Sequence, residues 1–132
     1  MKKQVNIGVV GVGHLGFHHA THLSKIKNAN LVGIYDIDSK RSDEVSKQLS
    51  VPSFESLDLL IDRVDALSIV TPTSTHKTVA EKCIQNGKHV FIEKPITTTV
   101  SDADHIIQLA KSNNTIIPVS YTHLTLPTIL LV

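Results

Sequence analysis

The stretch VNIGVVGVGHLG, residues 5–16, decides the fold that we expect for this chain. Its first half, residues 5–10, is a run of mostly β-branched residues and predicts a buried strand. Its second half places three glycines where that strand ends. From there, residues 14–25 carry small and apolar residues at helical intervals, so the stretch predicts a strand, a tight turn and a helix in direct succession.

Each glycine of GVGHLG has its own expected role. Gly11 permits the tight turn, Gly13 lets the backbone approach a pyrophosphate, and Gly16 lets the helix pack closely on the strand. The start of the helix would then present its free N–H groups and its positive end to phosphate. We therefore predict a dinucleotide-binding loop made of six residues: Gly11, Val12, Gly13, His14, Leu15 and Gly16.

Beyond this loop, short strand-like runs alternate with longer helix-like stretches. Further strands are expected at residues 30–35, 51–54, 66–70, 89–92 and 115–118. Helices are expected at residues 39–49, after the cap Ser56, from Thr75 to the Asn86-Gly87 pair, and after a capping pattern of Ser101 and Asp104. This alternation predicts an α/β fold, a doubly wound and mostly parallel sheet of the Rossmann type, with its ligand at the carboxyl ends of the strands.

An acidic residue, Asp36, closes the second expected strand 20 residues after Gly16. A carboxylate at this place accepts hydrogen bonds from the adenosine ribose, and its charge repels the 2'-phosphate of NADP. We therefore predict NAD as the cofactor. NADP stays open, because Asp38 could replace Asp36, and Lys40 or Arg41 could reach a 2'-phosphate if Asp36 turned away.

Two further motifs follow expected strands. In TPTSTH, residues 71–76, Thr71 and Pro72 would form a wall over the cofactor ribose and nicotinamide. His76 would either orient the nicotinamide or cap the next helix.

The motif EKP, Glu93, Lys94 and Pro95, falls at the carboxyl end of the strand expected at residues 89–92. Beside oxidised nicotinamide and out of water, the ammonium form of a lysine is disfavoured, so Lys94 could exchange a proton with a substrate hydroxyl. Pro95 would fix the turn that holds it.

Composition excludes several classes of function. The formal charge of +1, with 41% apolar residues, gives no basic surface for nucleic acid, and no apolar run is long enough to span a membrane. We expect a cytoplasmic protein that acts on a small molecule. His14, His18 and His22 share a helix face but lack a carboxylate or cysteine to complete a metal site, so no metal is predicted, and Cys83 is expected in the core.

GVGHLG, TPTSTH and EKP, taken together over residues 4–118, resemble the glucose-fructose oxidoreductase and inositol dehydrogenase family of NAD(P)-dependent sugar and polyol dehydrogenases. The resemblance implies hydride transfer between a hydroxyl-bearing carbon and nicotinamide, with Lys94 at the reacting hydroxyl. The sequence GHLGFHHA also looks like members that act on nucleotide-linked amino sugars. Thr73 departs from the asparagine that many members carry after T-P.

Family members continue into a second α/β domain that reads the substrate and makes the oligomer contacts, and we expect this domain to be missing here. The chain instead ends in VSYTHLTLPTILLV, residues 119–132, which has no Asp, Glu, Lys or Arg. Its first ten residues resemble a translated transposase adapter of the kind used in sequencing libraries. We therefore predict an NAD(P)-binding Rossmann domain over residues 1–118, a non-native tail over 119–132, and an inactive fragment of an oligomeric enzyme.

Two alternatives stay open. A regulatory module could bind NAD as a sensor without catalysis, but a sensor does not need Lys94. A transferase that uses S-adenosylmethionine also has a glycine-rich first turn, but the spacing of the three glycines and the EKP motif argue against it.

Overall fold

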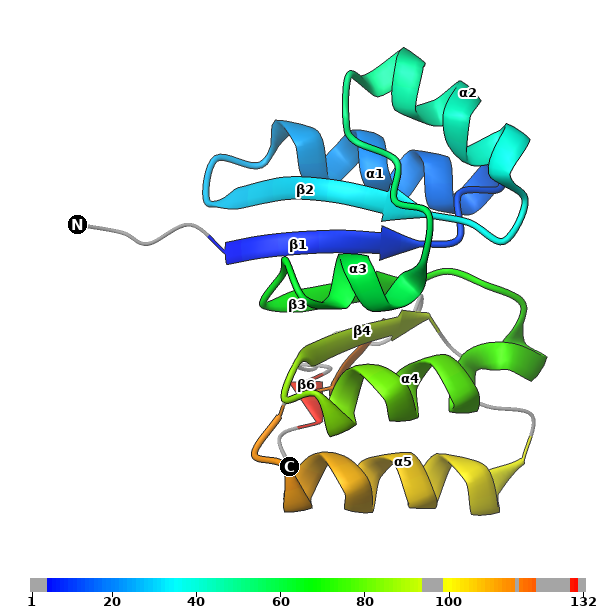
Figure 1. The fold of residues 1–132 in the computed structure, drawn as a ribbon. Coiled ribbons are helices and arrows are strands. Elements are labelled where there is room, and N and C mark those ends of the chain that lie inside the picture. The colour runs from blue at the N-terminus through cyan, green and yellow to red at the C-terminus, as the bar shows by residue number, and fades with distance from the viewer. Residues whose placement is uncertain (1–4, 94–98, 116, 121–128, 131–132) are drawn as a thin grey trace. The chain divides into compact units, whose positions relative to one another are not determined.

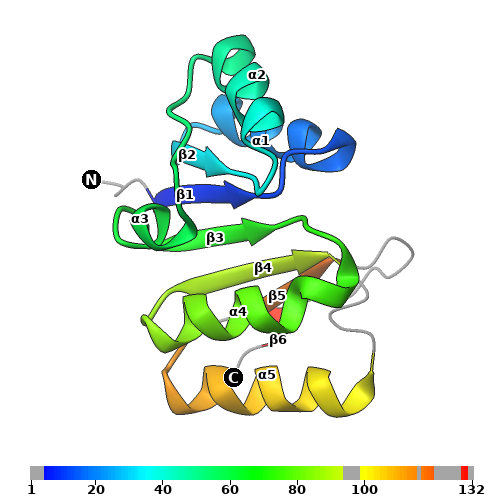
Figure 2. The ribbon, with the colours of Figure 1, turned by 45° about the vertical axis from the view of Figure 1, so that its right-hand side comes forward.

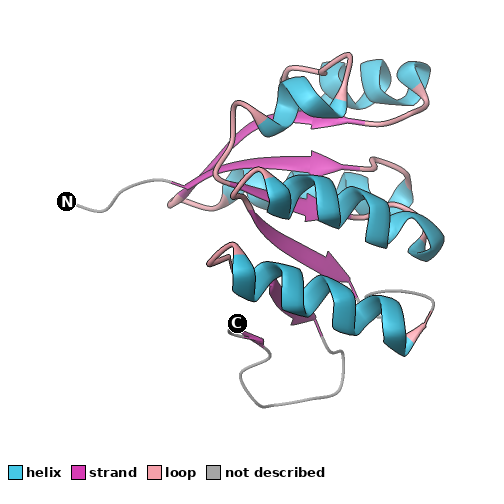
Figure 3. Cartoon of the chain, turned by 60° about the horizontal axis from the view of Figure 1, so that its bottom comes forward, coloured by secondary structure: helices cyan, strands magenta, loops and turns pink. Residues whose placement is uncertain are grey.

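The computed structural model describes residues 5–93, 99–115, 117–120 and 129–130. The chain divides into two compact units, Met1–Thr71 and Pro72–Val132. In both units, strands and helices follow one another along the chain, and most neighbouring strands pair in parallel (Figures 1 and 3). The predicted α/β class is therefore confirmed. Within the described part of the chain, no helix is both long and apolar enough to cross a membrane.

The first unit is built around its first strand. Its strands are β1 (Val5–Val10), β2 (Ala29–Tyr35) and β3 (Ala66–Ile69), and its helices are α1 (His14–Lys25), α2 (Ser39–Leu49) and α3 (Leu57–Ile61). β1 lies between β2 and β3 and runs parallel to both. Val9 stands opposite Ile34 on one side and opposite Ser68 on the other. The carboxyl end of the central strand therefore leads directly into the predicted glycine loop.

Helices cover both faces of these strands. Successive residues of a strand point to opposite faces, so Gly8 and Val9 show which helix lies where. A Cβ atom at Gly8 would lie 2.8 Å from the side chain of Leu60 in α3. Val9, by contrast, packs in a core cluster with Ala20 of α1. Thus α1 and α3 lie on opposite faces of the strands, as Figure 2 shows.

Residues 51–54 do not form the predicted strand. Ser53 makes a single parallel bridge with Ile34, flanked by bonds from Ile34 N–H to the Pro52 carbonyl (3.0 Å) and from Phe54 N–H to the Ile34 carbonyl (2.9 Å). The bridge cannot lengthen towards the N-terminus, because Pro52 has no N–H and the N–H of Val51 already donates to the α2 carbonyl of Ser46. The prediction of a strand over residues 51–54 was therefore wrong.

The second unit has the same alternation. It comprises the 3-10 turn η1 (Thr73–Thr75), α4 (His76–Gln85), β4 (His89–Glu93), α5 (Val100–Ser112), β5 (Ile117–Ser120) and β6 (Ile129–Leu130). β4 and β5 are parallel, and β6 pairs antiparallel with β5. α4 ends as predicted, because Gly87 takes the left-handed conformation at φ 76°.

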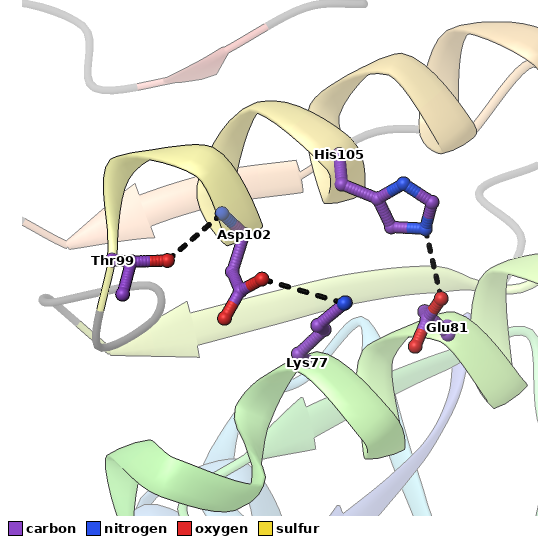
Figure 4. Close-up of polar contacts among 5 residues, drawn as sticks. All are labelled: Lys77, Glu81, Thr99, Asp102 and His105. Atoms are coloured by element: carbon purple, nitrogen blue, oxygen red, sulfur yellow. Dashed lines mark hydrogen bonds and ion pairs between the residues drawn. The ribbon is translucent and has the colours of Figure 1, made fainter.

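The helices α4 and α5 are joined by two polar contacts (Figure 4). Lys77 Nζ lies 3.3 Å from Asp102 Oδ1, and His105 Nε2 lies 2.8 Å from Glu81 Oε2. All four side chains keep a quarter or more of their surface in solvent, so each pair contributes at most about 1 kcal/mol to stability. These two pairs are therefore minor contributions to the stability of the second unit.

The N-cap of α5 lies two residues before the predicted one. Thr99, not Ser101, is the N-cap, and its Oγ1 accepts the N–H of Asp102 at 3.1 Å. The pattern of a hydroxyl residue followed three positions later by Asp occurs twice in this segment, at Thr99 and at Ser101. Thr99 has the extended backbone that a cap requires, whereas Ser101 already lies inside the helix. The predicted cap of α3 is confirmed, since Ser56 Oγ accepts the N–H of Leu59 at 3.2 Å.

The prediction that Cys83 belongs to the core is also confirmed. Its side chain is fully buried in α4, beside the buried Ala80 and Ile84. Desolvation raises the pKa of Cys83 to about 12, so the thiol stays protonated at neutral pH. A buried and protonated thiol is not a nucleophile, which removes cysteine chemistry from the candidate functions.

The contact of Gly16 with the strand end gives a stability prediction. A Cβ atom at Gly16 would overlap the carbonyl oxygen of Gly11, and backbone cannot move aside as a flexible side chain can. We expect Gly16→Ala to lower the free energy of unfolding by at least about 2 kcal/mol in urea denaturation. Gly13→Ala is the control, because a Cβ there would meet no atom within 4 Å, and its cost should stay below about 1 kcal/mol. Equal costs for the two variants would contradict this account of the turn.

Candidate dinucleotide-binding site

Two of the three glycines are required by the fold itself. Gly11 has φ +94°, and a Cβ on it would lie 2.9 Å from the carbonyl of Val70. Its N–H donates to the Tyr35 carbonyl at 2.8 Å, which ties the turn to the end of β2. Gly16 sits on the Gly11 carbonyl with no room for a side chain. The roles predicted for these two glycines therefore agree with their surroundings.

Gly13 is different, because nothing in the described protein requires a glycine there. It is exposed, its φ is −65°, and the space where a Cβ would stand is open. A glycine that the protein does not need is expected where a ligand must approach the backbone closely. Gly13 is therefore the position in the loop that indicates a ligand most directly.

The start of α1 lacks the usual ways of satisfying a helix N-terminus. Gly13 is its N-cap and has no side chain, and the first turn of α1 contains no acidic residue. α2, α3 and α5, by contrast, are capped by the side chains of Asp38, Ser56 and Thr99, whereas α4 resembles α1 in having no side-chain cap bond. The first N–H groups of a helix have no partner within the helix, so α1 presents donors and a positive dipole end that suit an anion.

Asp36 lies beside this loop, as predicted, but its carboxylate has a role before any ligand binds. Oδ2 accepts the N–H of Val12 at 2.8 Å, and Oδ1 accepts the N–H of Asp38 at 2.9 Å. Asp36 thus ties the glycine loop to the end of β2. Each carboxylate oxygen can accept a second hydrogen bond, so capacity for ribose hydroxyls remains. Asp38, considered as a substitute for Asp36, is occupied as the N-cap of α2.

Arg41 makes a contact that the sequence did not predict. Its Nε donates to the Val12 carbonyl at 2.8 Å, and its guanidinium carbon lies 5.9 Å from the centre of the Phe17 ring. The spacing of 29 residues between Arg41 and Val12 follows no local pattern, so no sequence signal could have revealed the bond. Next to Asp36, Ile37 is 92% exposed, an unusual amount for an aliphatic side chain.

The other loop side chains face outward. His14 and Leu15 are both exposed, and the His14 ring meets the His18 ring edge-on at 4.8 Å between centroids. Among the described residues, no three His, Cys, Asp or Glu side chains are placed to hold one metal ion. His19, by contrast, is structural, because its Nδ1 forms a hydrogen bond of 3.2 Å with the buried Ser68 of β3.

The TPTSTH motif divides between the two units. Thr71 belongs to the first, and its Cγ2 methyl lies 3.0 Å from where a Cβ of Gly11 would stand, so it borders the glycine loop. Pro72 and His76 belong to the second unit. Pro72 is exposed, and His76 is only 3% exposed at the first position of α4, where Thr75 rather than His76 is the N-cap.

The EKP motif begins where β4 ends. Glu93 is the last residue of β4 and pairs with Ser120 of the parallel strand β5, so the motif starts at a carboxyl end, as expected. Lys94 and Pro95 lie outside the described residues. The predicted catalytic use of Lys94 therefore remains a prediction.

Several known proteins are similar to this chain in sequence and in fold. A family model described as "Oxidoreductase family, NAD-binding Rossmann fold" matches residues 5–121. UDP-N-acetylglucosamine 3-dehydrogenase of Acidithiobacillus ferrooxidans is 43% identical over 86% of this chain and 36% of its own length. Glucose-6-phosphate 3-dehydrogenase of Bacillus subtilis is 41% identical over 78% of the chain and 29% of its own length. The solved structure of the Acidithiobacillus enzyme has a TM-score of 0.85 over 88% of this chain and 38% of that one.

The bonds of Asp36 predict a stability effect without any ligand. In Asp36→Ala, the N–H of the fully buried Val12 would lose its acceptor, so the free energy of unfolding should fall by about 1–3 kcal/mol. Asp43→Ala, an exposed acid on α2, is the control and should change stability by less than about 0.5 kcal/mol. Urea denaturation without cofactor measures both. A cost for Asp36→Ala no larger than the control's would mean that the carboxylate does not hold the loop.

Proposed function

Because the chain belongs to the oxidoreductase family with an NAD-binding Rossmann fold, we propose that it is the cofactor-binding part of an NAD-dependent sugar or polyol dehydrogenase. The chain spans about a third of the length of the curated relatives that it matches. The proposal is therefore about the longer protein, in which a further part would complete the substrate site. For this chain alone, it implies cofactor binding with little or no turnover.

The observation that carries the proposal is the geometry of the glycine loop. Gly11 and Gly16 bring the uncapped start of α1 to the end of β1, and Gly13 leaves the backbone open to an anion. The residues that would hold the dinucleotide are those of the loop, for the pyrophosphate, and Asp36, for the adenosine ribose. The half-buried Asp36 is fixed beside the loop by two amide donors, which supports NAD over NADP, because its charge would face a 2'-phosphate.

The chemistry that we propose is the removal of the proton from a substrate hydroxyl and of a hydride from the carbon that bears this hydroxyl. NAD⁺, when bound, would supply the hydride acceptor. Lys94, in its neutral form, takes the hydroxyl proton, so that alcohol and NAD⁺ become ketone, NADH and a proton on the lysine. Thr71 and Pro72 would shield the nicotinamide end, and Pro95 would hold Lys94 in place.

The substrate class follows from the names of the relatives. UDP-N-acetylglucosamine 3-dehydrogenase and glucose-6-phosphate 3-dehydrogenase share a glucose-type ring and the 3-position of oxidation. We propose a ring hydroxyl of a sugar, with the 3-hydroxyl of glucose derivatives as the first to test. The residues that would distinguish a nucleotide-linked sugar from a sugar phosphate would lie in the rest of the longer protein.

The test is steady-state kinetics on the longer protein with Lys94→Met. We expect kcat for oxidation of UDP-N-acetylglucosamine or glucose 6-phosphate to fall at least about 100-fold, because the base is lost, while the Kd for NADH stays within about threefold. Lys111→Met, an exposed lysine on α5, is the matched control and should change neither.

Two outcomes would count against the proposal. Turnover by Lys94→Met at the wild-type rate would remove the lysine from the mechanism. If the wild-type protein bound NADH but oxidised no sugar or polyol, a sensor that binds NAD without catalysis would be favoured instead.

A further inference from the structure

Val12 is held by three separate contacts although it lies in a loop. Its side chain is fully buried and packs in the core cluster with Val9 and Ala20. Its N–H donates to Asp36 Oδ2 at 2.8 Å, and its carbonyl accepts from Arg41 Nε at 2.8 Å. These contacts come from β1, α1, the end of β2 and α2, so the loop between β1 and α1 is fixed in the absence of any ligand.

The bond from Arg41 has a consequence one residue further on. The carbonyl of Val12 and the N–H of Gly13 belong to the same peptide unit, which is planar and trans, so they point in opposite directions. A donor that fixes the Val12 carbonyl therefore also fixes the Gly13 N–H and turns it away from the guanidinium. Gly13 is the exposed residue of the loop whose surroundings are open to a ligand.

Arg41 is itself held firmly enough to do this. Its backbone N–H donates to Asp38 Oδ1 at 3.2 Å in the first turn of α2, and its guanidinium lies over the Phe17 ring. A charged donor also polarises the peptide that it binds, which strengthens the N–H at the other end as a donor. The bond from Arg41 thus both orients and polarises the Val12–Gly13 peptide. Both effects favour an anion bound to the N–H of Gly13.

We propose that Arg41 is a positioning residue for the dinucleotide pyrophosphate, acting through the Val12–Gly13 peptide rather than by touching a phosphate. The proposal rests on the proposed cofactor binding. It differs from the role considered from the sequence, in which Arg41 would reach the 2'-phosphate of NADP. The bond from Nε to the Val12 carbonyl favours the new role, because it directs the guanidinium to the loop backbone.

Three substitutions separate the donor from the charge. Gln places its amide nitrogen the same number of bonds from the backbone as Arg Nε, so Arg41→Gln keeps the donor and removes the charge. Lys keeps the charge but carries its nitrogen one atom further out. Arg41→Ala removes both. Lys47→Gln, an exposed lysine on the same helix, is the control for lost charge.

The experiment is calorimetry of NADH and NADPH binding to the 132-residue chain. We expect Arg41→Ala to weaken NADH about tenfold, the loss typical of a charge-assisted hydrogen bond at its lower end. Arg41→Gln should stay within about threefold of wild type, Arg41→Lys should lie between Arg41→Gln and Arg41→Ala, and Lys47→Gln should not change NADH binding. The ratio of NADH to NADPH affinity should be the same in wild type and Arg41→Ala.

Two results would overturn the proposal. If Arg41→Ala weakened NADPH alone, the residue would read the 2'-phosphate. If Arg41→Lys kept wild-type affinity while Arg41→Gln lost it, the charge rather than the bond to Val12 would matter.

A second readout needs no ligand and so separates this proposal from the proposed function. The amide ¹H–¹⁵N signal of Gly13 should move in Arg41→Ala and return near its wild-type position in Arg41→Gln, because only Gln restores the bond on the same peptide. An unmoved signal in Arg41→Ala would refute the positioning role of Arg41. Wild-type chain that binds no NADH would instead refute the proposed function, and the Gly13 signal would still decide the role of Arg41.

Discussion

The first turn of α1 lies so close to the carbonyl of Gly11 that position 16 has no room for a Cβ atom. This approach fixes where the helix begins and directs its uncapped N-terminus at the end of β1. It also determines which residues can surround the loop, because α1 then packs its Ala20 against Val9 of the central strand. The residues of the first unit that surround the loop are arranged around this one contact of backbone on backbone.

Around that contact, the loop is stabilised by polar groups that serve two purposes. Asp36 satisfies the buried N–H of Val12, and the same carboxylate stands where an adenosine ribose is expected. Arg41 satisfies the carbonyl of Val12 and brings a positive charge near the loop. Two side chains of opposite charge thus bond the N–H and the carbonyl of one residue, Val12. Loops fixed in this way lose little conformational entropy when a ligand binds, which favours affinity.

Sequence reasoning found the features whose cause is local. The strand, turn and helix at residues 5–25, the cap Ser56 and the left-handed Gly87 all follow from residue type and spacing. It failed at the start of α5, where Thr99 and Ser101 both begin a capping pattern. It also failed at residues 51–54, because the N–H of Val51 already donates to Ser46 and Pro52 has no N–H. It could not find the bond of Arg41 to Val12, since that bond depends on how α2 packs beside the loop.

The central claim is that the backbone from Gly13 to Gly16 binds the pyrophosphate of a dinucleotide. A titration of the ¹⁵N-labelled chain with NADH, followed by amide ¹H–¹⁵N spectra, tests it most directly. The account predicts that the largest shifts fall on the amides of Gly13, His14, Leu15 and Gly16, because these donors are left without partners by the helix start. A folded chain whose spectrum did not change, or whose shifts left these four amides untouched, would contradict it.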